Sequence, residues 1–142
     1  MILVDLSEYY QIKPLKDVCD AFITENAAKP ENVLKLYESF KRYTLKTAMA
    51  KVMETIASNT DEILKSKDFS SIEKETLLDI VKMDNLNSKE EELFQAVLIW
   101  VLNKHKNNEN EIKTELADVF PFIRFPIMDL EFLHNFVEKY NQ

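Results

Sequence analysis

The absence of glycine is the feature that most limits how this chain can fold. None of its 142 residues is glycine, whereas an average protein contains about 7%. Tight hairpins, left-handed turns and phosphate-binding loops all depend on glycine, because it alone adopts positive φ angles without steric cost. The composition therefore disfavours a sheet-rich fold or a nucleotide-binding enzyme and predicts a protein built from helices.

Apolar residues recur with helical spacing along almost the whole sequence. The first series, with Leu15, Val18, Cys19 and Phe22, follows the i, i+3, i+4, i+7 pattern of one helical face. Pro30 is expected to open the second helix. The periodic stretches lie within residues 15–23, 33–40, 43–57, 63–64, 77–81, 93–101, 111–119 and 132–140. We expect an all-α fold of about eight short helices, stacked as antiparallel helical hairpins.

Polar residues next to these stretches predict where several helices begin. Ser70 with Glu73, and Ser88 with Glu91, have the spacing of a capping box, in which serine and glutamate side chains bind each other's backbone amides. Asp129 is expected to cap the last helix. These carboxylates therefore have a structural explanation and need no catalytic one.

Net charge and cysteine content exclude several classes of function. A formal net charge of −7 opposes binding to nucleic acid or to an anionic membrane surface, although it can also simply keep the surface soluble. Cys19 is the only cysteine, which rules out a disulfide within the chain; its apolar neighbours indicate that it is buried. We expect no membrane span, no signal peptide, and a cytoplasmic or possible nuclear location.

No group of residues has the pattern of a catalytic or metal site. His105 and His134 lie far apart and have no neighbouring Cys or His at ligand spacing, so we expect no bound metal and no other cofactor. His105 is expected to be solvated, and His134 to lie at the surface or pack in the last helix. We expect no catalytic residue and no enzymatic activity.

Four segments, in order, resemble the BACK domain of BTB-BACK adaptors. Residues 77–101, which read LLDIVKMDNLNS followed by KEEELFQAVLIWV, resemble its signature, with Trp100 at the tryptophan position. Residues 119–128, VFPFIRFPIM, resemble a later element, and residues 30–34, PENVL, resemble the start of the helix pair called the three-box. Residues 9–25 are similar to the last BTB helix. The resemblance implies a BTB C-terminal helix region at 1–28 and the three-box plus BACK domain at 29–142.

The resemblance also implies a function. Members of this family are non-catalytic adaptors that bring substrates to a cullin-RING ubiquitin ligase, so the implied partner is a cullin N-terminal domain. The substrates would bind a domain absent here, and the parent protein would form a homodimer through the missing BTB domain. The implied cullin-contacting residues are Val33, Leu34, Tyr37, Phe40, Tyr43 and Leu45.

Two alternatives remain open at this stage. The same six residues can be ordinary core, since paired helices bury apolar stripes in any case. The domain can also be a helical spacer or interaction module, for example for a cytoskeletal partner, without cullin contact. Trp100 is expected to be a core anchor, and Arg124 a structural brace that pairs with a carboxylate or an aromatic ring.

Overall fold

The computed structural model confirms an all-α fold. It describes residues 2–26, 29–43, 45–106 and 108–140, and within these ranges it contains nine α-helices, three 3-10 helices and no strand. The elements are α1 (Ile2–Tyr9), α2 (Lys13–Asn26), α3 (Val33–Phe40), α4 (Lys46–Ser58), α5 (Thr60–Leu64), η1 (Phe69–Ser71), α6 (Lys74–Val81), α7 (Glu90–Lys104), α8 (Glu109–Val119), η2 (Phe120–Phe122), η3 (Phe125–Ile127) and α9 (Leu130–Tyr140).

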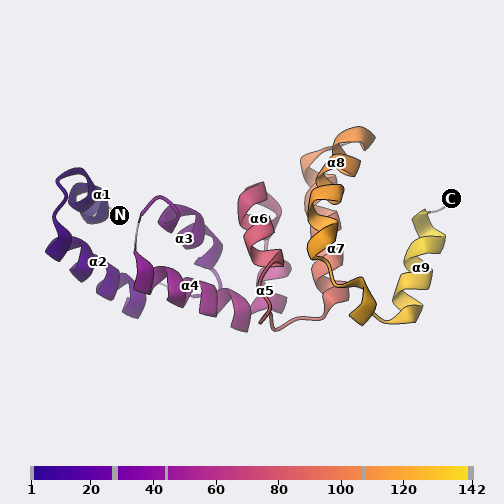
Figure 1. The fold of residues 1–142 in the computed structure, drawn as a ribbon, viewed down its shortest axis with the longest axis horizontal. Coiled ribbons are helices and arrows are strands. Elements are labelled where there is room, and N and C mark those ends of the chain that lie inside the picture. Colours follow the sequence, from indigo (N-terminus) through magenta and orange to yellow (C-terminus); the bar gives the residue numbers. More distant parts are fainter. Residues whose placement is uncertain (1, 27–28, 44, 107, 141–142) are drawn as a thin grey trace.

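The helices form a single row that follows the order of the chain. Figure 1 shows α1 and α2 at one end, α9 at the other, and the two chain ends far apart. Helix α2 packs on α1 and α4, α3 packs on α4, and α5 and α8 pack on α7. Because almost every helix packs on near neighbours in the sequence, the fold resembles a short solenoid.

The core runs along this row, and α7 contributes six buried apolar residues to it. Trp100 is 1% exposed, and its indole N–H donates to the Ile72 carbonyl at 3.0 Å, so the expectation of a core anchor is confirmed. Phe94 is fully buried and contacts the rings of Phe125 and Phe136 at centroid distances of 5.4 and 4.9 Å. These aromatic contacts fix η3 and α9 against α7.

Both predicted capping boxes are wrong. Helix α6 begins after Glu73 and α7 begins after Lys89, and neither residue makes a side-chain cap. The Glu73 amide donates to Glu38 Oε1 on α3 at 2.8 Å, and Glu91 Oε1 accepts from the Asp129 amide at 2.6 Å. The glutamates fail as local caps because each of these amides and carboxylates is already bound to a distant segment.

Carboxylates from earlier helices bind the starts of later elements at four places. Besides the Glu38 and Glu91 contacts, Asp20 on α2 accepts from the Ala48 and Thr47 amides of α4 at 2.7 and 3.2 Å. Glu90 accepts from the Arg124 amide at 2.8 Å. Anionic groups are stabilised at the positive end of the helix dipole. We call these four contacts the cross-helix caps.

Several predicted boundaries shift by a few residues. Pro30 lies in a turn, and α3 begins only at Val33; α4 begins at Lys46, although its apolar pattern starts at Tyr43. Helix α1 had no predicted counterpart, despite the apolar residues of its sequence, ILVDLSEY. The local cap by Asp129 is confirmed, since its Oδ1 accepts from the Glu131 amide at 3.0 Å.

The turn between α1 and α2 shows how the chain manages without glycine. Gln11 has a φ angle of 54°, the only positive value among the residues described. Residues other than glycine pay a steric cost in this region because of the Cβ atom. Gln11 also donates its backbone amide to the Glu8 carbonyl at 3.3 Å, which closes the turn.

Candidate functional site

Helices α3 and α4, which the resemblance predicts to be the three-box, and the turn between them contain the six residues predicted to contact a partner. Five of these are buried in the core, with exposed fractions of 6% or less, and only Tyr43 is half-buried. The five are Val33, Leu34, Tyr37, Phe40 and Leu45. Their burial matches the alternative interpretation that they are core residues, and Tyr43 alone is partly accessible.

A polar network joins the three-box to α6. The Tyr37 hydroxyl donates to Asp79 Oδ2 at 2.9 Å, and the Lys41 ammonium lies 2.7 Å from the same oxygen. Burial and the hydrogen bond to Asp79 raise the pKa of Tyr37 well above its usual range. Burial acts to lower the pKa of Lys41, but its pairs with Asp79 and Glu75 raise it. The carboxylate thereby holds α3 in register with α6.

Two further contacts join the three-box to α1 and α2. The Tyr43 hydroxyl donates to Asp5 on α1, and this hydrogen bond raises the pKa of Tyr43. Asp20 on α2 caps α4, as described above. The first two helices and the three-box therefore form one packed unit.

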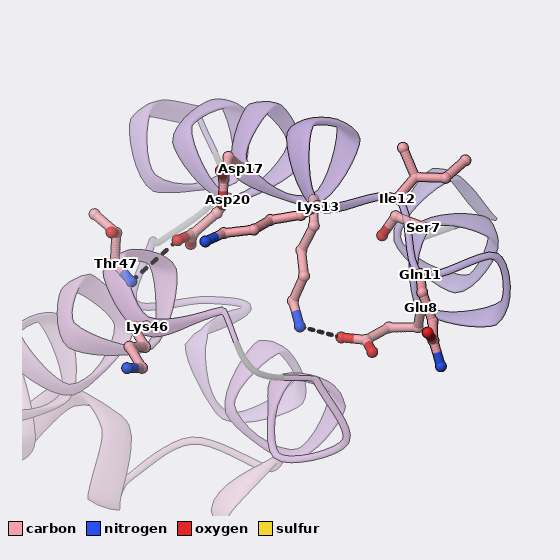
Figure 2. A pocket seen from close by; sticks show the side chains of 10 residues that line it. Ser7, Glu8, Gln11, Ile12, Lys13, Asp17, Asp20, Lys46 and Thr47 are labelled. Carbon is pink, nitrogen blue, oxygen red and sulfur yellow. Dashed lines mark hydrogen bonds and ion pairs between the residues drawn. The ribbon is translucent and has the colours of Figure 1, made fainter.

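A hollow of about 530 Å³ lies between α1, α2 and the start of α4 (Figure 2). Lys16 and Glu8 form an ion pair at 2.5 Å along its wall. The lining residues are Ser7, Glu8, Gln11, Ile12, Lys13, Lys16, Asp17, Asp20, Lys46 and Thr47. Both signs of charge line the hollow, which suits a polar peptide segment better than an apolar small molecule.

Helices α1 and α2 also expose large apolar side chains. Val18 and Phe22 are 66% and 67% exposed, so the expectation that they lie on the buried face of α2 is wrong. Leu15 and Ile23 pack against the core instead, and Cys19 is buried as predicted. The exposed set, which we call the N-terminal apolar face, consists of Ile2, Leu3, Leu6, Tyr9, Tyr10, Ile12, Val18 and Phe22. Exposed apolar clusters commonly mark interaction surfaces.

The two histidines lie far from this region. The expectation that His105 is solvated is wrong, because its side chain lies between Glu111 and Glu115 and is only 14% exposed. His134 lies at the surface as expected, 3.5 Å from Glu138. Among the residues with described positions, no three His, Cys, Asp or Glu side chains are grouped as a metal site requires. No helix within the described ranges is both long and apolar enough to cross a membrane.

Arg124 is the brace that the sequence predicted. Its guanidinium pairs with Asp84 in the loop between α6 and α7, and its amide donates to Glu90. These two contacts attach the connection before α9 to the loop that precedes α7 and to the first residue of α7. The sequence did not identify Asp84 as the partner of Arg124, because the two residues lie 40 positions apart.

A row of helical pairs that pack on near neighbours in the sequence places the chain in the solenoid-like helical class. The sequence matches the family described as "BACK: BTB And C-terminal Kelch" over residues 33–138. The chain belongs to the BACK family.

Similar proteins match over most of the chain. Human Kelch-like protein 41 is 29% identical over 135 residues, which cover 94% of this chain and 22% of that protein. Human Kelch-like protein 6 is 30% identical over 128 residues, or 89% of this chain and 20% of that protein. BTB/POZ domain-containing protein 9 from Bos taurus is 28% identical over 134 residues, covering 94% of this chain and 21% of that protein.

The chain spans about a fifth of the length of these curated relatives. No solved structure matches the chain.

Proposed function

We propose that this chain is a non-catalytic adaptor segment of a cullin-RING ubiquitin-ligase substrate receptor. In this role the three-box helices contribute to binding a cullin N-terminal domain, and the BACK helices separate that contact from a substrate-binding domain. The observation that carries the proposal is membership of the BACK family over residues 33–138. The elongated row of helices, whose ends lie far apart (Figure 1), suits a spacer that separates two binding sites.

The proposed domain arrangement accounts for the N-terminal apolar face. If residues 1–28 are the end of a BTB domain, the rest of that domain would cover side chains such as Val18 and Phe22, which are exposed here. Covering apolar area of this kind contributes roughly 25 cal/mol per Å². The same BTB domain would make the parent protein a homodimer, and a separate domain would bind the substrates.

The contact with a cullin would use the surface around the three-box and only part of its core. Of the six predicted residues, Tyr43 is the accessible one, whereas the buried five would act by fixing the positions of α3 and α4. The hollow in Figure 2 adjoins the start of α4 and offers Ile12 and Lys46 to an incoming segment. We therefore propose Tyr43, Ile12 and Lys46 as the first contacts to test.

The alternative function is a helical spacer or interaction module without a cullin contact. The observation that favours it is the burial of Val33, Leu34, Tyr37, Phe40 and Leu45, which leaves no open groove between α3 and α4 at these positions. Under this alternative, the N-terminal apolar face would still serve in assembly, for example with a cytoskeletal partner.

Nuclear magnetic resonance can distinguish these two functions, because it detects contacts that are too weak for calorimetry. The 15N-labelled chain is titrated with the N-terminal domain of the cullin that binds BTB proteins. We expect amide shift changes to cluster at α3, the start of α4 and the hollow.

Ile12→Asp should reduce the changes, and Ile99→Asp is the matched control, since Ile99 is 55% exposed on the distant helix α7. If the cullin domain leaves every amide unshifted, or if both variants respond alike, the cullin contact is refuted and the spacer alternative stands.

A further inference from the structure

His105 occupies an unusual position at the junction of α7 and α8. Its Nδ1 lies 2.7 Å from Glu111 Oε2 and its Nε2 lies 3.2 Å from Glu115 Oε1, so both ring nitrogens face carboxylates. A neutral imidazole has one N–H donor and one acceptor nitrogen, whereas an imidazolium donates from both. Only the protonated ring can form both hydrogen bonds at once, because a neutral ring directs a lone pair at one carboxylate.

The position of His105 at a helix end also suits a cation. His105 is the C-cap residue of α7, and its amide donates to the Val101 carbonyl. A cation at this end is stabilised by the negative pole of the helix dipole. The ring is mostly shielded from solvent, as is the Glu115 side chain, which is 13% exposed, so salt screens this pair less than it would a surface pair.

Charged groups from three helices face this position. Lys74 on α6 binds Glu115 at 3.0 Å and Asp118 at 2.5 Å, and Lys104 on α7 lies 3.6 Å from Glu115. Burial acts to raise the pKa of Glu115, but Lys74 and His105 outweigh it and lower that pKa. The three carboxylates Glu111, Glu115 and Asp118 face two ammonium groups, so a protonated His105 makes the cluster neutral.

Helix α8 has little else to hold its first turns. Val119, at its last position, is its one fully buried residue, whereas Ile112 and Leu116 are only partly buried. Its local cap is a long hydrogen bond of 3.4 Å from the Glu111 amide to Asn108. The docking of residues 109–116 on α7 therefore depends on the charged cluster together with the partly buried Ile112 and Leu116.

We propose that the protonation of His105 controls whether the first turns of α8 dock on α7, which makes this junction a pH-sensitive conformational switch. Histidine is the side chain that ordinarily changes charge between about pH 5 and 8. When His105 is neutral, Glu111 and Glu115 lose the cation that they share, and residues 109–116 loosen. Residues 117–119 stay docked through Val119.

Hydrogen exchange and imidazole resonances of the 142-residue chain test this switch. Between about pH 5.5 and 8.5, we expect protection factors of amides in residues 112–116 to fall by about tenfold or more, with the same midpoint as the His105 ring resonance. Amides of α4 should keep their protection factors. His134→Gln is the control and should behave like the unmodified chain.

His105→Gln removes the titrating group and should give low protection of residues 112–116 at both ends of the pH range. Should this variant fail to fold, the comparison of midpoints in the unmodified chain decides the matter. The switch is refuted if His105 does not titrate in this range, if it titrates without a change in α8, or if His105→Gln retains the pH dependence.

Discussion

Replacing Asp20 by alanine tests whether the cross-helix caps stabilise the fold. Asp20 accepts two backbone hydrogen bonds at the start of α4, from Ala48 at 2.7 Å and Thr47 at 3.2 Å. Losing an N-cap side chain typically costs about 1 kcal/mol, and losing the charge at the helix dipole costs roughly 0.3–1 kcal/mol more. We expect Asp20→Ala to lower the free energy of unfolding by about 1–2 kcal/mol, which corresponds to a fall in melting temperature of about 3–8 °C.

Urea unfolding followed by circular dichroism at 222 nm measures this loss. Asp17→Ala is the matched control, because Asp17 is exposed on the same helix and lines the same hollow. It should change the unfolding free energy by no more than about 0.5 kcal/mol. Equal effects of the two substitutions would show that Asp20 does not stabilise α4 as a cap, since general loss of negative charge would then explain both. The amide resonances of Thr47 and Ala48 should shift only in Asp20→Ala.

Three further predictions concern the core, the turn at Gln11 and the loss of stability at acidic pH. Trp100→Phe should destabilise the chain by about 2–4 kcal/mol in urea unfolding, because it leaves the Ile72 carbonyl unpaired and opens a cavity; a loss below about 1 kcal/mol would contradict this. Gln11→Gly should raise the unfolding free energy by up to about 1 kcal/mol, since glycine accepts a φ of 54° without strain, and any loss of stability would count against that argument. The hydrogen bond from the Asp129 amide lowers the pKa of Glu91 in the folded chain. The ionised Glu91 therefore stabilises the fold at neutral pH, and this stabilisation is lost as the pH falls through the lowered pKa. Urea midpoints measured from pH 7 to 3 should therefore fall less in Glu91→Gln than in the unmodified chain, and parallel curves would exclude this role.

The fold class and most helices follow from local information in the sequence. Helical spacing of apolar residues, the lack of glycine and the cap at Asp129 are all properties of neighbouring residues, and they predicted the all-α fold, the burial of Cys19 and the anchor at Trp100. Such patterns are reliable because helices are stabilised by contacts three or four residues apart.

The missed features depend on contacts between distant parts of the chain. Glu91 has the spacing of a local cap but binds the Asp129 amide 38 residues later. His105 lies in a polar stretch yet is shielded by carboxylates of the next helix. Phe22 fits an apolar stripe but faces outward, because α2 rests on its neighbours through only one side. No local pattern distinguishes these outcomes, since each depends on which helix lies alongside.

The cross-helix caps also favour folding in order from the N-terminus to the C-terminus during synthesis. In every cap the carboxylate precedes the amide that it binds, by 27 to 38 residues. During synthesis, Asp20 and Glu38 leave the ribosome before the helix starts that they bind, and Glu90 and Glu91 likewise precede the connection to α9. The starts of α4, α6, η3 and α9 can therefore dock on acceptors that are already in place while the chain is still being made.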